Sequence, residues 1–125
     1  MYQLKPEIKE RWFAKMDELA DRQGRLALVS LYLTNLPNYC ALGVLGLACQ
    51  EVTGQGKFVE NETAFCLEEH AEGNCDYVIT LDALELMANE FDEEEAVNFT
   101  KAVVKMNDGW RYTFAQIKAS ITDQC

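Results

Sequence analysis

The sequence predicts one α-rich α+β domain, in which a central buried helix is surrounded by about four other helices and a small antiparallel sheet. Three observations support this fold class. Apolar residues recur at helical spacing near both ends of the chain, the segment 38–52 is apolar on nearly every side, and β-compatible residues gather around Asn61. A chain of 125 residues with 49% hydrophobic residues is long enough to bury a single core.

The N-terminal region predicts an amphipathic helix followed by a strand. Pro6 suits the first position of a helix, and Trp12 and Met16 lie on an apolar stripe that continues toward Gly24, a natural stop. The run 26–33 is rich in apolar and β-compatible residues, and we interpret it as a strand.

The segment 38–52 predicts the central helix. Asn38 is a suitable N-cap, Gly54 a suitable end, and the residues between them leave almost no polar face. Gly43 and Gly46 each cost a helix about 1 kcal/mol relative to alanine. Their presence therefore suggests that a neighbouring element packs closely against the helix backbone.

The middle of the chain predicts the small sheet. Residues 57–67 are interpreted as two short strands around Asn61 and Glu62, and 76–79 as a further strand. Thr80 then caps a short helix that carries apolar residues as far as position 88.

The last third of the chain predicts two more helices, each introduced by a capping-box pattern. Asp92 is followed three residues later by Glu95, and Thr113 by Gln116. The Asn-Asp-Gly sequence at 107–109 predicts a turn between the two helices.

Charge is distributed very unevenly along the chain. The formal net charge is −10, yet 1–57 holds six acids and seven bases and 101–125 holds two acids and four bases. The remaining segment, 58–100, holds thirteen acids and no lysine or arginine. Such a segment repels nucleic acid and anionic membranes and attracts basic protein surfaces.

The basic residues of the first helix give no nucleic-acid site. Lys9, Arg11 and Lys15 alternate with acids such as Glu10 and Asp17, which predicts an ion-paired solvent face. No apolar run is long enough to span a membrane, and residues 1–7 lack the apolar core of a signal peptide. We therefore expect a cytoplasmic protein that binds neither nucleic acid nor membrane.

The five cysteines are expected to be reduced thiols, because no export signal accompanies them. Cys66, His70 and Cys75 lie close in sequence, and Cys40 or Cys49 would complete a zinc site, but the tight Cys-x2-Cys pair of most structural sites is missing. A catalytic cysteine with His70 as its general base would also need a third group that orients the histidine, and the sequence identifies none. The sequence thus predicts no catalytic residue, no metal and no cofactor.

Several short motifs recur together in known sequences. They are Trp12, Gln-Gly-Arg-Leu at 23–26, Tyr-Cys-Ala-Leu-Gly-Val-Leu at 39–45, Met-Asn-Asp-Gly at 106–109 and Phe-Ala-Gln-Ile at 114–117. Together they resemble a group of short uncharacterised proteins from bacteriophages and bacterial genomes, in which a Cys-x-Leu-Gly-Val-Leu helix precedes an Asn-Asp turn and a final Phe-x-x-Ile helix. The acidic middle lies outside the resemblance. The resemblance implies a phage-type accessory protein and supplies no activity.

These observations lead to one functional hypothesis. The protein is expected to bind and inhibit a host protein that has a basic surface, such as a defence or nucleic-acid-handling factor, in the host cytoplasm. The expected contact residues are acids of the 58–100 segment and two aromatic residues beyond it. They are Glu60, Glu62, Glu68, Glu69, Glu72, Asp76, Glu90, Glu93, Glu94, Glu95, Trp110 and Tyr112.

Three alternatives remain open at this stage. The acids can be a solvated face that partly serves helix capping, since Asp92 and Glu95 have that local role. The chain can also be a small-ligand-binding or regulatory domain, with a pocket near the Cys40 helix and the turn at 107–109. A virion component is the third alternative, and the sequence leaves a homo-oligomer open in every case.

Overall fold

The computed structural model describes residues 2–23, 29–30, 38–59, 64–67 and 79–122. Within these ranges it confirms the α-rich α+β fold. Five α-helices are present in the described residues: α1 (Pro6–Glu18), α2 (Ala41–Thr53), α3 (Leu81–Met87), α4 (Glu93–Val104) and α5 (Phe114–Thr122). A short 3-10 helix, η1 (Ala20–Arg22), follows α1, and a π-helical turn, η3 (Lys105–Gly109), continues α4.

The strands form three separate antiparallel pairs in the described part of the chain. The pairs are β1 (Gln3–Leu4) with β6 (Ala88–Glu90), β2 (Val29–Ser30) with β3 (Asn38–Tyr39), and β4 (Lys57–Val59) with β5 (Ala64–Cys66). The expected sheet is therefore small and antiparallel, but it is divided among three separate two-stranded pairs, one of which joins segments far apart in the chain.

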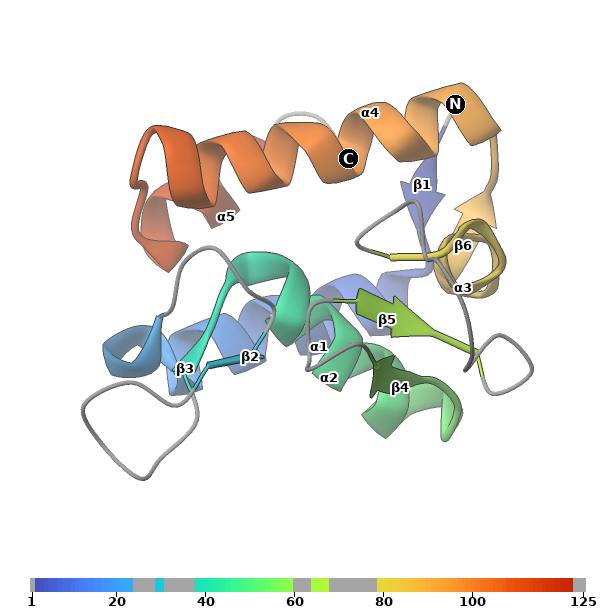
Figure 1. The fold of residues 1–125 in the computed structure, drawn as a ribbon, viewed down its shortest axis with the longest axis horizontal. Helices are drawn as coiled ribbons and strands as arrows, with labels where there is room; N and C mark the ends of the chain where they lie inside the picture. Colours follow the sequence, from blue (N-terminus) through green and yellow to red (C-terminus); the bar gives the residue numbers. More distant parts are fainter. Residues whose placement is uncertain (1, 24–28, 31–37, 60–63, 68–78, 123–125) are drawn as a thin grey trace.

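The helices enclose one core between two layers. Figure 1 shows α4 running along one side of the molecule, with α1 and α2 crossing beneath it and α5 folding back below its far end. The largest fully buried side chains come from α1, α2, α3, α5, β5 and the bridge residue Ile79: Ile8, Trp12, Met16, Leu42, Leu45, Phe65, Ile79, Leu84, Met87, Phe114 and Ile117. No described helix has both the length and the apolar character needed to cross a bilayer.

The first helix begins where the sequence predicts, but it ends at Glu18, before the predicted stop at Gly24, and the 3-10 helix η1 follows. Helix α1 begins at Pro6, and Ile8, Trp12 and Met16 bury one stripe completely. The Trp12 indole Nε1–H donates to the Ala41 carbonyl oxygen at 2.9 Å. This bond satisfies the indole inside the core and ties α1 to the first turn of α2.

The central helix is buried as predicted, but its predicted start is wrong. Asn38 does not cap it, because Asn38 and Tyr39 pair with β2 as strand β3, and the helix begins at Ala41 after Cys40. Its end at Gly54 is confirmed. Gly54 adopts a φ of +72°, the left-handed conformation in which glycine carries no Cβ penalty.

Close packing at Gly46 is also confirmed. A Cβ placed there would lie 2.9 Å from Phe58 Cζ and 2.9 Å from Phe65 Cδ1. These two rings are cross-strand partners in the β4–β5 pair, and their centroids are 5.1 Å apart. The hairpin therefore rests on α2 through two phenylalanines, which explains why the helix lacks a side chain at this position.

The strands of the middle region are confirmed where the structure describes them. The β4–β5 pair matches the interpretation of 57–67, whereas Asn61 and Glu62 lie outside the described residues. Ile79 forms an isolated bridge to Phe65, and 76–78 also lie outside. Of the strand expected at 26–33, residues 29–30 form β2 and the rest lies outside the description.

Two features of the last third differ from the sequence prediction. Residue Ala88 leaves the short helix and opens strand β6, which pairs with β1. The turn predicted at 107–109 is wrong, because the helix continues there with π geometry. The Trp110 N–H donates to the Lys105 carbonyl oxygen at 2.8 Å, five residues back. The π turn adds a residue to the helix, so that Met106 and Asn107 are both buried.

Both capping interactions are present. The Glu95 N–H donates to Asp92 Oδ1 at 3.0 Å at the start of α4. The Thr113 N–H donates to Gln116 Oε1 at 2.9 Å, and the Gln116 N–H donates back to Thr113 Oγ1 at 3.3 Å. The second pair is a complete capping box.

Replacing Gly46 with alanine should destabilise the protein. In an unobstructed helix the change would stabilise by about 1 kcal/mol. Here the new methyl group collides with Phe58 and Phe65, so we expect the free energy of unfolding to fall by about 1–3 kcal/mol in urea titration. Phe58→Leu should relieve part of this cost when both substitutions are combined. A stabilised Gly46→Ala variant would contradict the packing described above.

Candidate functional site

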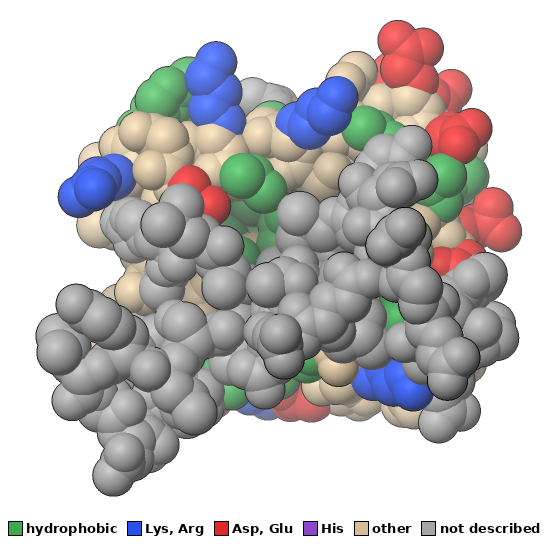
Figure 2. All heavy atoms as spheres, viewed as in Figure 1, with side chains coloured by type: hydrophobic (Ala, Val, Ile, Leu, Met, Phe, Trp, Pro, Cys, Tyr) green, Lys and Arg blue, Asp and Glu red, His purple; other side chains and the backbone are tan. Residues whose placement is uncertain are grey.

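Exposed carboxylates gather where α3, β6 and the start of α4 meet. We call this surface the acidic end and define it by Glu85, Glu90, Asp92, Glu93, Glu94 and Glu95, all exposed. Figure 2 shows acidic side chains gathered at the end of the molecule that carries the start of α4. The sequence from 79 to 100 contains no lysine or arginine to neutralise them. Carboxylates from three elements therefore form one surface.

An aromatic side chain lies within the acidic end. Phe91 is 36% exposed and follows Glu90 directly in sequence. Its ring meets that of Tyr2 edge to face, with centroids 6.3 Å apart, and the buried Tyr2 hydroxyl donates to the Leu84 carbonyl oxygen at 3.0 Å. Phe91 is thus held by a fixed neighbour while part of its ring faces solvent.

Part of the acidic charge has a local structural role. Asp92 caps α4, and Glu93, Glu94 and Glu95 occupy its first turn, where the helix dipole favours negative charge by about 0.3–1 kcal/mol per residue. Glu85 and Glu90 lie outside that turn and gain nothing from this dipole. Helix capping therefore accounts for some of the acidic end and not for all of it.

The two aromatic residues expected at the contact surface lie elsewhere. Trp110 is 54% exposed and stacks near Tyr112, with ring centroids 5.4 Å apart and Lys105 Nζ 5.2 Å from the Trp110 ring centre. This group follows the C-terminus of α4, about 18 Å of helix away from Glu93. Arg111 adjoins it and adopts a φ of +57° where the chain leaves the helix.

The expected contact residues are therefore only partly united. Glu90, Glu93, Glu94 and Glu95 come together, whereas Trp110 and Tyr112 form a separate group at the opposite end of α4. The remaining expected residues lie outside the described part of the chain: Glu60, Glu62, Glu68, Glu69, Glu72 and Asp76. The sequence analysis did not select Phe91, although an apolar residue inside an acidic run was a usable signal.

The motif residues that carry the family resemblance meet around one buried side chain. Asn107, 1% exposed, projects inward from the π turn. Its Oδ1 accepts from Gln23 Nε2 at 2.9 Å and from the Ala41 N–H at 3.2 Å, and its Nδ2 donates to Asp108 Oδ1 at 2.7 Å. One carboxamide thus joins η3 to the first turn of α2 and to the end of the α1 region.

Gln23 extends this network to the last helix. Its Nε2 also donates to the Tyr112 carbonyl oxygen at 2.7 Å, and its Oε1 accepts from the Phe114 N–H at 3.1 Å. The Phe114 amide at the first turn of α5 would otherwise lack an acceptor in the helix. The polar groups near the Cys40 helix therefore satisfy one another in the space where the sequence suggested a ligand pocket.

The cysteines in the described ranges are buried. Burial, the largest effect, together with the nearby Asp108 carboxylate raises the pKa of the Cys40 thiol to about 11, and burial also raises the pKa of Cys49. Cys66 is buried as well. No group of three metal-ligating side chains occurs in the described ranges, and His70 and Cys75 fall outside them.

The solvent face of α1 carries ion pairs, as the sequence predicts. Arg11 and Lys15 both contact Glu51 of α2, at 2.5 Å and 2.8 Å, and the bond from Lys15 lowers the pKa of Glu51. Lys118 of α5 pairs with Asp17 at 2.5 Å. A shallow pocket of about 270 Å³ opens beside this face, lined by Glu7, Glu10, Arg11, Ala14 and Val52.

Comparison of the chain with protein-family models, curated proteins and solved structures finds no match in any of the three. Function must therefore be argued from the chemistry of the surfaces described above.

Replacing Asn107 with alanine should be strongly destabilising. The change leaves the Ala41 N–H and Gln23 Nε2 without their buried acceptor, so we expect the free energy of unfolding to fall by about 2–4 kcal/mol in urea titration. Asn98→Ala on the exposed face of α4 is the matched control and should stay within about 0.5 kcal/mol of the wild type. Equal effects of the two substitutions would show that the buried carboxamide is unimportant.

The Cys40 thiol should make stability fall in alkaline solution. Below its ordinary pKa of 9.0 the thiol is neutral in both states, but between pH 9 and about 11 only the unfolded chain ionises. Stability is therefore lost as pH rises through this window, by up to about 1.4 kcal/mol per pH unit. Cys40→Ala should show a shallower fall in the free energy of unfolding over the same window. Identical pH profiles for the two proteins would contradict the burial of the thiol.

Proposed function

We propose that this protein is a small binding protein whose acidic end docks onto a basic surface of another protein and blocks it. One observation carries the proposal. Exposed carboxylates from three elements accompany Phe91, a partly exposed aromatic side chain between Glu90 and Asp92, in a stretch of chain without a single lysine or arginine. This combination of a charged rim and an apolar contact is typical of protein-binding surfaces.

The two components have different physical roles. The carboxylates attract a basic surface over distances near the Debye length and raise the rate of encounter. Exposed charges add little affinity by themselves, because water and salt screen them. Phe91 supplies apolar area that is removed from water on binding, and its contact with Tyr2 limits the conformational freedom lost at that step.

The family resemblance suggests the kind of partner. A phage-type accessory protein acts in the host cell, so the partner in this proposal is a host protein of the cytoplasm with a basic groove, such as a defence or nucleic-acid-handling factor. Blocking such a groove requires no catalysis, and the proposal assigns no catalytic residue. The alternative of a small-ligand site near Cys40 and 107–109 has less support, because the polar groups there are bonded to one another.

Neutralising the acidic end should weaken partner capture. We expect the variant Glu90→Gln, Glu93→Gln, Glu94→Gln to retain a host protein from bacterial lysate at least about tenfold more weakly than the wild type, which itself should release it at high salt. The measurement is affinity capture at low and high salt, followed by titration of the captured protein. Asp92 is left intact because it caps α4.

A matched control shows whether binding depends on where the carboxylates lie or only on the net charge of the protein. The variant Glu7→Gln, Glu10→Gln, Asp21→Asn removes three exposed carboxylates from the α1 region and should bind like the wild type. Phe91→Ser should weaken binding while preserving its dependence on salt. Equal losses in the two charge variants would show that only total charge matters, and the proposed surface would then be wrong.

A further inference from the structure

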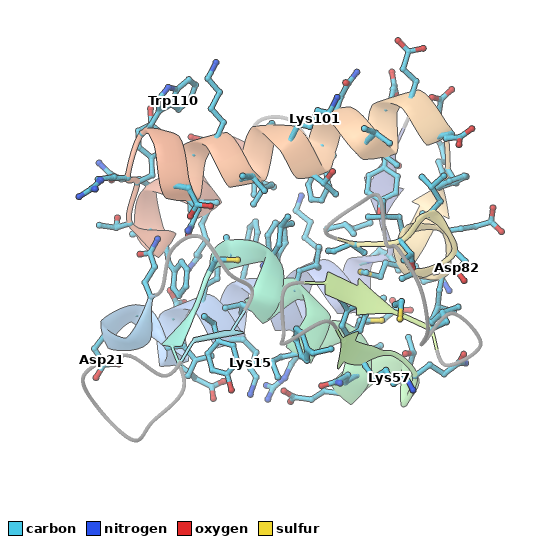
Figure 3. The ribbon with its side chains drawn as sticks, in the orientation of Figure 1. Lys15, Asp21, Lys57, Asp82, Lys101 and Trp110 are labelled. Atoms are coloured by element: carbon cyan, nitrogen blue, oxygen red, sulfur yellow. The ribbon has the colours of Figure 1, made fainter. Side chains whose placement is uncertain are left out.

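The solvent face of α4 has opposite charge at its two ends. Glu94, Asn98, Lys101 and Lys105 follow one another at three- and four-residue spacing, so they share one face, and all four are exposed. We call these four residues the α4 stripe. Figure 3 shows Lys101 and Trp110 projecting from the same side of this helix, away from the rest of the molecule. The stripe thus runs from an acidic start to a basic end.

The charges of the stripe are not neutralised by any residue in the described ranges. The residues that the structure describes give Glu94, Lys101 and Lys105 no ion pair, although Lys105 lies over the Trp110 ring. The other side of α4 packs into the core, where Ala96, Thr100 and Val103 are buried. The stripe is therefore an unpartnered helix face with its own pattern of charge.

We propose that two copies of this chain pair through α4 in antiparallel orientation, related by a two-fold axis. Glu94 and Lys105 lie at equal distances in sequence from the midpoint between Phe99 and Thr100, and so do Asn98 and Lys101. An antiparallel pairing about this midpoint places Glu94 of each copy against Lys105 of the other, twice. Asn98 and Lys101 meet in the same way, so the stripe is complementary to itself.

The exposed hydrophobic residues fit the same pairing. Of the three large hydrophobic side chains exposed in the described ranges, Phe91 precedes α4 and Trp110 follows it, while Val52 lies on α2. The two-fold arrangement brings Phe91 of one copy opposite Asp108 of the other, two residues from Trp110. Ala102, exposed beside the stripe, is small enough to let the two helices approach at the usual 8–10 Å between axes.

This self-association stands independently of the proposed function, but it uses the same acidic end. In the dimer, Lys105 and Trp110 of a second copy would contact the acidic end. They would supply a basic and an aromatic side chain, as the proposed partner would. The dimer and the partner complex therefore compete for one surface. Because a single helix pair with charged contacts buries little area, the dimer is weak and sensitive to salt.

Charge-reversal variants of the purified protein test the dimer in the absence of any partner protein. Sedimentation equilibrium at low salt, over concentrations rising to the millimolar range, should show a monomer–dimer equilibrium that weakens at high salt. Glu94→Lys places two lysines opposite each other, so the dimer dissociation constant should rise by at least about tenfold. Lys105→Glu should have the same effect, and the double variant Glu94→Lys, Lys105→Glu should restore dimerisation.

The control variant is Glu85→Lys, which makes the same change in net charge as Glu94→Lys but lies on α3. It should leave the dimer intact, and circular dichroism should confirm that all variants keep their helices. A wild-type protein that stays monomeric at every concentration, or a double variant that does not recover, would overturn the proposal. Partner capture can succeed or fail separately, because it requires only the monomer.

Discussion

The buried Asn107 carboxamide is the constraint on which the arrangement of the helices depends. It receives hydrogen bonds from the first turn of α2 and from Gln23, and Gln23 in turn accepts from the first turn of α5. A buried amide group left without partners costs more than the net value of the bond that satisfies it, so each helix must begin where this network allows. The π turn follows from the same requirement, because it brings Asn107 to the inner face beside Met106. Gln23, Ala41, Asn107 and Phe114, which belong to the short motifs noted in the sequence, thus form one structural network.

A row of aromatic rings connects this core to the acidic end. Trp12 donates to the Ala41 carbonyl oxygen, and its ring meets Phe99, which meets Tyr2, which meets Phe91. The centroid distances are 5.9, 5.3 and 6.3 Å in that order, within the range of favourable ring pairs. The surface phenylalanine is therefore the last member of a packed series that begins in the core. Because its neighbours already restrict the Phe91 side chain, it loses less conformational entropy when it contacts another surface.

Sequence reasoning succeeded where the signal is local. Helical spacing identified α1 and α4, both capping patterns form, and the two helix glycines pointed to the close approach that Phe58 and Phe65 make at Gly46. It failed where distant segments decide the outcome. The pairing of β1 with β6 joins residues 3–4 to 88–90, and Asn38 is drawn into β3 by a strand earlier in the chain. Asn107-Asp108-Gly109 has the composition of a turn, yet the helix continues there because Asn107 finds buried partners. The candidate site shows the same limit: the acids were visible in the sequence, but the contact of Phe91 with Tyr2 joins residues far apart in the chain.

The position of the acidic end has a physical explanation that also bears on its use. Carboxylates repel one another, and a cluster of them normally lowers stability. The first turn of a helix is a favourable place for such a cluster, because the helix dipole and the unpaired N–H groups there favour negative charge. The opposite argument holds for Lys101 and Lys105 near the end of α4. Helix electrostatics therefore allows one helix to display two surfaces of opposite sign without destabilising the fold, and both of the proposed contacts, with a basic protein and with a second copy of the chain, would use this helix.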